Sequence, residues 1–157
     1  MTEILEALAQ HPFTHNLDQA EREAMAAFAV ARTYEPDEMI LREGKAADAF
    51  FLIVSGLVAI ELLLPDRGLL RLQTVGAGEV IGWSWLVPPY RWGFDARAIS
   101  PTSAVLMDAK KLRGLFESDH RLGFHVVRDL LTVVAERLKA ARLQLLDIYS
   151  LPKEARR

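Results

Sequence analysis

The sequence predicts an α+β fold: an antiparallel β-roll or jelly roll, flanked by N-terminal helices and followed by a long C-terminal helix. Short apolar runs divided by turn residues fill the middle of the chain, a pattern typical of sandwiches and jelly rolls. Apolar residues at helical spacing precede and follow this region. At 157 residues the chain fits one domain, 1–157, with N-terminal helices at 1–31, a roll at 32–108 and C-terminal helices at 109–151.

Two short helices are expected before the roll. Residues 3–9 place apolar side chains on one helical face, and Pro12 interrupts the pattern. Asp18 is a suitable N-cap for a second helix over 19–30.

The predicted strands of the roll are separated by glycine-containing turns. They are 50–54, 58–64, 69–75, 96–99 and 104–107. Ser55 and Gly56 form a tight turn between the first two strands. Residues 65–68 (PDRG) turn the second strand back onto the third as a hairpin.

The C-terminal region predicts a short helix over 109–117 and a long one over 120–149, ended near Pro152. The long helix carries apolar residues at alternating spacings of four and three, which are Val127, Leu131, Val134, Leu138, Ala141, Leu145 and Ile148. Such a seam is typical of a two-stranded coiled coil, so Val127 to Leu145 are predicted to form a homodimer interface. Packing of the helix on its own roll is the alternative.

Composition excludes several classes of protein. The net charge of −2 gives no bulk signal for nucleic-acid binding. The absence of cysteine excludes disulfides and thiolate chemistry. No N-terminal signal peptide and no apolar run of membrane-spanning length is present, so a cytoplasmic protein without membrane contact is expected.

Several local patterns together resemble the cyclic nucleotide-binding domain family. They are Glu43-Gly44 with Ala47-Asp48, the strand–glycine–strand run 53–58 (IVSGLV), and the approach 76–82 (GAGEVIG) to a cassette at 78–98. The resemblance covers about residues 12–148. It implies a sensory module like that of the catabolite activator protein, and a nucleotide such as cyclic AMP as ligand. Since the chain ends soon after Ile148, no helix-turn-helix and no DNA binding are expected.

The phosphate-binding cassette of this family places a short helix, a carboxylate and an arginine around the ligand. The resemblance aligns Trp83 with the carboxylate and Trp92 with the arginine. A buried cyclic phosphate needs a compensating charge, and Arg91 would supply it if the loop at Pro88-Pro89 shifted by one residue. The predicted ligand-binding residues are Gly82, Trp83, Ser84, Trp85, Arg91 and Trp92.

Ser84 is expected either to cap the cassette helix or to accept a ribose hydroxyl. Asp95 and Arg97 are expected to face outward as a surface pair, alternating with inward Ala96 and Ala98. Glu79 is read as a turn residue.

The three tryptophans of this segment leave three interpretations open. In the first, the rings fill the nucleotide pocket. In the second, they stack on a planar ligand, and in the third, they form an exposed anchor for a protein partner.

The sequence offers no catalytic or metal-binding signature. His11 and His15 are separated by Pro12, and His120 and His125 do not share a helical face. We therefore expect a non-catalytic, homodimeric, regulatory protein that senses a ligand and acts in signal transduction through an unknown effector protein. A ligand-free scaffold with the same fold is the alternative.

Overall fold

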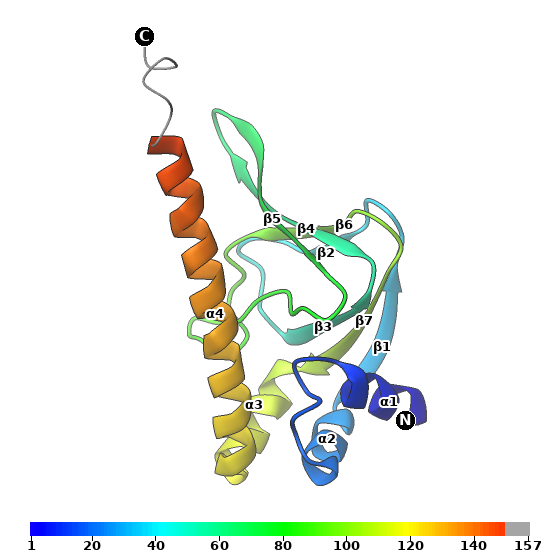
Figure 1. Ribbon diagram of the computed structural model, residues 1–157. Coiled ribbons are helices and arrows are strands. Elements are labelled where there is room, and N and C mark those ends of the chain that lie inside the picture. Colours follow the sequence, from blue (N-terminus) through cyan, green and yellow to red (C-terminus); the bar gives the residue numbers. More distant parts are fainter. Residues whose placement is uncertain (150–157) are drawn as a thin grey trace.

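Two antiparallel sheets enclose the core of the protein, as the computed structural model of residues 1–149 shows (Figure 1). One sheet has the strand order β1-β7-β3 and the other β2-β6-β4-β5. The strands are β1 (Ala29–Tyr34), β2 (Met39–Leu41), β3 (Ala49–Ser55), β4 (Leu57–Leu64), β5 (Gly68–Gly76), β6 (Asp95–Ala98) and β7 (Thr102–Asp108). The predicted mixed α+β roll is confirmed.

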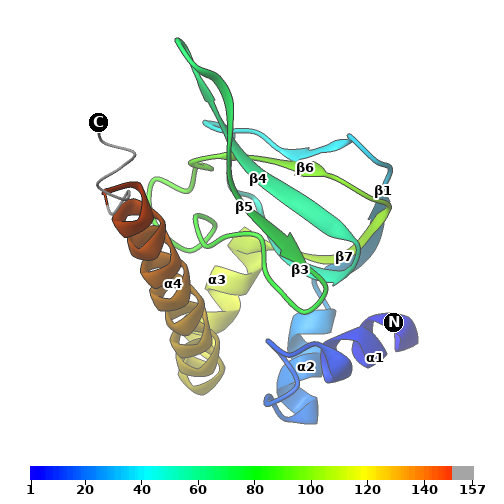
Figure 2. The ribbon, with the colours of Figure 1, turned by 45° about the horizontal axis from the view of Figure 1, so that its top comes forward.

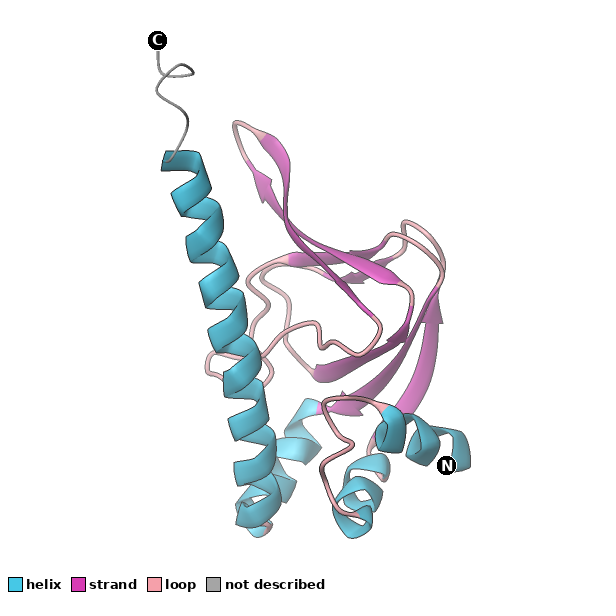
Figure 3. Ribbon diagram, viewed as in Figure 1, coloured by secondary structure: helices cyan, strands magenta, loops and turns pink. Residues whose placement is uncertain are grey.

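Three short helices gather at one end of the roll, while the long helix runs along its side (Figures 1 and 3). The short helices are α1 (Thr2–Gln10), α2 (Gln19–Ala26) and α3 (Ala109–Ser118), and the long helix is α4 (His120–Tyr149). The predicted bounds of the long helix are therefore confirmed. In the part of the chain that the structure describes, no helix is both long and apolar enough to cross a membrane. The predicted helix end near Pro152 lies outside the described residues.

The second N-terminal helix is shorter than predicted. Asp18 does cap it, accepting a hydrogen bond from the backbone N–H of Glu21 at 2.8 Å. The helix ends at Ala26, however, because the chain enters the sheet at Ala29, which pairs with Met107 of β7. The expected boundary of the roll near residue 32 is corrected to Ala29.

The hairpin between β4 and β5 is confirmed, with pairs running from Leu57–Gly76 to Leu64–Gly68. The predicted tight turn at Ser55 and Gly56 is confirmed, but it does not close a hairpin, because β3 pairs with β7 and the chain crosses to the other sheet. Gly56 has a φ of +96°, and a Cβ there would lie 2.5 Å from the carbonyl oxygen of Pro101. Only glycine fits this crossing without strain.

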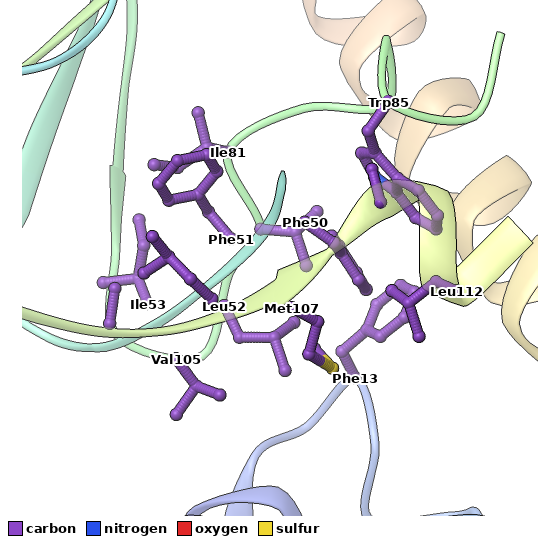
Figure 4. Packing of buried hydrophobic residues seen from close by; sticks show 14 of the residues in the cluster. Phe13, Phe50, Phe51, Leu52, Ile53, Ile81, Trp85, Val105, Met107 and Leu112 are labelled. Atoms are coloured by element: carbon purple, nitrogen blue, oxygen red, sulfur yellow. The ribbon is translucent and has the colours of Figure 1, made fainter. Parts of the chain in front are cut away.

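Aromatic rings fill the core where the roll meets the short helices (Figure 4). The ring of Phe50 stacks on Trp85 at a centroid distance of 4.6 Å and meets Phe13 edge-on at 5.2 Å. Phe116 of α3 also lies beside Trp85, at a centroid distance of 6.2 Å. This core joins the cassette segment to the N-terminal region, β3 and α3.

Candidate functional site

The cassette segment lies between β5 and β6 and follows an irregular path along α4 (Figure 2). In place of the expected short helix, this segment forms two overlapping turns. Leu86 N–H donates to Trp83 O at 3.0 Å, and Val87 N–H donates to Ser84 O at 3.3 Å. Pro88 and Pro89 prevent a longer helix, because they lack backbone N–H donors and disfavour helical backbone before them. Ser84 therefore caps no helix, and the segment lacks a helix N-terminus for a phosphate.

The register of the loop after the prolines is fixed by backbone hydrogen bonds to residues 44–47. Trp92 N–H donates to Lys45 O at 3.0 Å, and Trp92 O accepts from Gly44 N–H at 2.8 Å. This pairing turns Trp92 inward and Arg91 outward. The exposed guanidinium of Arg91 donates to Gly44 O at 2.8 Å, so the inward shift considered for Arg91 does not occur.

Trp92 fills the inside of the roll beside Gly82, and it is only 3% exposed. Its ring packs with Phe51 and Phe94 at centroid distances of 6.0 and 6.1 Å. A Cβ on Gly82 would lie 2.9 Å from Phe94 and 3.1 Å from Trp92. The position that the resemblance assigns to an arginine is thus occupied by a packed aromatic cluster.

Trp85 belongs to the core and not to a ligand surface. It is fully buried, it stacks on Phe50, and it lies beside Phe116. Its indole N–H has no hydrogen-bond partner within the described residues. The expectation that Trp85 contacts a ligand is corrected, because its own domain covers both ring faces. With Trp92 also buried, the tryptophans do not form an exposed anchor for a partner protein.

Trp83 is the one tryptophan that borders a cleft. It is half-buried and faces the middle of α4 across a space of about 410 Å³. Nine of the twelve residues lining this cleft are apolar. They are Ile60, Leu72, Ile81, Trp83, Phe94, Val134, Leu138, Ala140 and Ala141, with Gln73, Arg137 and Gln144 as the polar members. A cleft of this size accommodates a small molecule.

Arg137 of α4 connects the helix to the cassette. Its guanidinium donates to Ile81 O at 2.8 Å and to Val80 O, and it lies 5.7 Å from the centroid of the Trp83 ring. Burial lowers the pKa of Arg137 below its ordinary value, and the nearby charges of Glu79 and Glu136 oppose this shift. Sequence reasoning missed Arg137, because Glu136 and Lys139 are charged as well and no local pattern singles out the residue that faces the roll.

On its other side Arg137 borders a second cleft of about 610 Å³, which is more polar. Glu79, Asp129 and Glu136 line it, together with Pro12 and Asn16 from the N-terminal segment. Glu79 accepts a hydrogen bond from Gly76 N–H at 2.7 Å, as its predicted role in a turn requires. Arg137 therefore separates an apolar cleft from an acidic one.

Asp95 and Arg97 do not form the expected pair. Arg97 binds the carboxylate of Glu61 through Nε and Nη2, at 3.0 and 3.2 Å, and Asp37 through Nη1 at 2.7 Å. Asp95 instead accepts from the backbone N–H of Glu43 at 2.8 Å. Arg97 pairs across the strands because Glu61 on β4 is buried, and a buried carboxylate requires a charged partner.

The buried and half-buried histidines have structural partners. His11 Nε2 donates to Ile53 O, and His11 Nδ1 accepts from Phe13 N–H, both at 3.1 Å. His125 of α4 lies 3.2 Å from the carboxylate of Glu21 on α2. Within residues 1–149, no group of three or more His, Asp or Glu side chains is arranged to hold a metal ion.

Comparison with known proteins identifies one family. Residues 31–119 match the family model of the cyclic nucleotide-binding domain. Glutaminase 1 of Bradyrhizobium diazoefficiens is 32% identical over 136 residues, which are 85% of this chain and 21% of the glutaminase. The chain thus spans about a fifth of the length of that relative.

Two solved structures show the same fold. A cyclic nucleotide-binding domain from Methylobacillus flagellatus has a TM-score of 0.79 at 23% identity, covering 97% of this chain and 85% of that one. The catabolite activator protein of Thermus thermophilus has a TM-score of 0.70 at 25% identity, with coverages of 88% and 63%.

Proposed function

Because this chain belongs to the cyclic nucleotide-binding domain family, we propose that it is a non-catalytic ligand-sensing module that works as a homodimer. In this proposal a small ligand occupies the cleft beside Trp83, and α4 transmits its presence to a protein partner in a signalling pathway. The observation that carries it is the apolar seam of α4, which is exposed and also borders the cleft.

The seam residues are poorly covered by their own domain. Val127, Leu131, Leu138 and Leu145 are 43%, 64%, 50% and 54% exposed. Val134 is half-buried and Ala141 is exposed; the side chain of Ile148 lies outside the described residues. Exposed leucines at heptad spacing favour pairing with a second helix, which removes their apolar surface from water.

The cleft and the seam share Val134, Leu138 and Ala141. A ligand in the cleft would therefore contact the cassette on one side and the dimer helix on the other. It changes the dimer only if it binds one arrangement of α4 more tightly than another.

The dimer is tested by sedimentation velocity of the wild type and two matched variants. Leu138→Glu places a charge in the seam and should give monomers. Leu143→Glu makes the same change at another exposed leucine, on the opposite side of α4, and should leave the dimer intact. A monomeric wild type, or a Leu138→Glu variant that stays dimeric, would remove the seam from the proposal.

Ligand binding is tested first with the family's own ligand class. Thermal unfolding is followed with cyclic AMP, cyclic GMP and a cyclic dinucleotide. A ligand at 100 times its Kd stabilises by about 2.7 kcal/mol, roughly 5–10 °C for a domain of this size. Arg91→Ala should leave any such shift unchanged, because the Arg91 guanidinium is held outside by Gly44.

A ligand-free scaffold is the second candidate function. The packing of Trp92 and Phe94 against Gly82 favours it, because these rings occupy the place where the resemblance expects a phosphate contact. A dimer that binds no small molecule, yet captures a partner equally well when Trp83 is replaced, would support the scaffold.

The similarity to a fifth of a glutaminase suggests a third setting for the same module. In that setting it regulates a larger protein to which it is joined. Fusion of this chain to a reporter enzyme, with and without Leu138→Glu, would show whether its dimerisation alters an attached domain.

A further inference from the structure

The cleft beside Trp83 is apolar except for one positive charge and two amides. Its apolar wall includes Ile60 and Leu72 from the roll, Trp83 and Phe94 from the cassette, and Leu138 from α4. No aspartate or glutamate lines it. A ligand that fills it needs a largely apolar body, because each buried polar atom without a partner weakens binding.

The positive charge belongs to Arg137, which has no paired carboxylate in the part of the chain that the structure describes. Among the described residues, no carboxylate oxygen lies within 4.0 Å of its guanidinium. Its nearest acids, Glu79 and Glu136, line the neighbouring cleft and not this one. The guanidinium has five N–H donors, and the carbonyls of Val80 and Ile81 each accept one.

A partly desolvated guanidinium with unused donors favours an anion, and a carboxylate matches its fork geometry. We propose that the cleft binds a hydrophobic carboxylic acid, whose apolar body lies against Trp83 and Leu72 and whose carboxylate pairs with Arg137. This inference rests on the proposed sensor function and names the class of its ligand.

A cyclic nucleotide fits the cleft less well than such an acid. Its ribose hydroxyl, phosphate oxygens and base edge all require hydrogen-bond partners. The cleft offers Arg137, Gln73 and Gln144, while the positions aligned with the family's carboxylate and arginine are Trp83 and Trp92. An acid with one charged group leaves far fewer polar atoms unpaired.

The position of Arg137 links this ligand to the dimer. The residue holds α4 to the cassette through Val80 and Ile81. It directly precedes the seam residue Leu138 and lies about one helical turn after Val134. A ligand carboxylate that draws the guanidinium away from the carbonyls of Val80 and Ile81 would loosen the contact between α4 and the cassette. This part of α4 also carries the exposed seam that we propose to pair with a second copy of the chain.

The test compares two probes of nearly identical shape, 1-naphthaleneacetate and its neutral amide, 1-naphthaleneacetamide. Isothermal titration of the full chain should show the acid binding roughly ten- to hundredfold more tightly than the amide, the range expected for a hydrogen bond to a charged group. Arg137→Gln should reduce the affinity for the acid to that for the amide. Arg142→Gln, a change at an exposed arginine of the same helix, should leave both affinities unchanged.

A second variant keeps the test decisive if Arg137→Gln fails to fold. Leu72→Trp introduces a larger side chain into the cleft from β5 and leaves Arg137 itself unchanged. It should abolish binding of both probes. Equal affinities for acid and amide, acid binding that survives either variant, or no binding of the acid at millimolar concentration would each overturn the proposal.

These failures are distinguishable from failure of the sensor function. Binding of cyclic AMP but not of the acid would overturn the proposal of a carboxylic acid ligand and would still support a ligand-sensing function. A wild-type monomer in sedimentation velocity contradicts the dimeric sensor, whatever the probes do.

Discussion

Trp83 and Trp85 are two residues apart, yet they occupy opposite kinds of environment. Trp85 is fully buried and stacks on Phe50, in the core that joins the roll to the short helices. Trp83 is half-buried, has the Arg137 guanidinium near its ring and borders an apolar cleft. The same residue type therefore supports packing at one position and leaves space at the other.

The difference comes from what surrounds each ring. Phe50 and Phe116 lie beside Trp85, Phe13 packs on Phe50, and the Trp85 side chain is fully buried. Trp83 faces α4, where Val134 and Ala141 are too short to fill the space between helix and roll. Stability is thus concentrated at the core end, and the capacity to bind a ligand at the cleft end.

The largest expected effect comes from Trp85→Ala. Removal of a fully buried tryptophan should lower the free energy of unfolding by about 3–5 kcal/mol, because the surrounding rings cannot collapse into the cavity. Urea unfolding monitored by circular dichroism measures this loss. A loss below about 1 kcal/mol, the typical effect of a single substitution, would show that the core end is not close-packed.

A smaller effect is expected for Trp83→Ala, the matched change at the cleft end. It should cost about 1 kcal/mol, since the ring is only half-buried and its contact with Arg137 is worth about that much. The same urea experiment measures it. If the two substitutions destabilised equally, the contrast between core and cleft would be wrong.

The smallest effect is a pH dependence at the core end. Burial lowers the pKa of His11 from its ordinary value of 6.5, although hydrogen bonds to Ile53 and Glu79 oppose the shift. The neutral ring is also the form required by geometry, since Nδ1 accepts from Phe13 N–H. A histidine whose folded pKa is depressed contributes stability above pH 6.5 and loses it as the pH falls below that value, because the unfolded chain binds the proton more readily.

Unfolding of the wild type and His11→Gln at pH 7.5 and 5.5 measures this contribution. The wild type should lose more stability than the variant on acidification. Equal losses in the two proteins would show that His11 does not contribute to the pH dependence.

Much of the fold was predictable from local patterns. The strands around 50–54, 58–64 and 69–75 and the helix over 120–149 are where alternation and heptad spacing place them. The second helix was predicted too long, because the apolar residues near Phe28 suit a helix as well as a strand, and only pairing with β7 decides between them.

The candidate site was predicted less well. The spacing of the cassette identified the segment, but it did not separate Trp83 from Trp85, since no helix forms there to give a regular face. The direction of Arg91 depends on hydrogen bonds to residues 44–47, and Arg97 pairs with Glu61 across the sheet instead of with Asp95. Contacts between residues so far apart in the chain leave no local pattern.

The sequence by itself determined the order of the elements, the turn at Gly56 and the apolar seam of α4, because each depends on residues close together in the chain. Tertiary structure alone decided that the chain crosses to the other sheet after β3, that Trp92 packs against Gly82 and that Arg137 lies near Trp83. Those outcomes depend on which distant surfaces come together and on how much volume remains between them. That remaining volume is the cleft where we propose that the ligand binds.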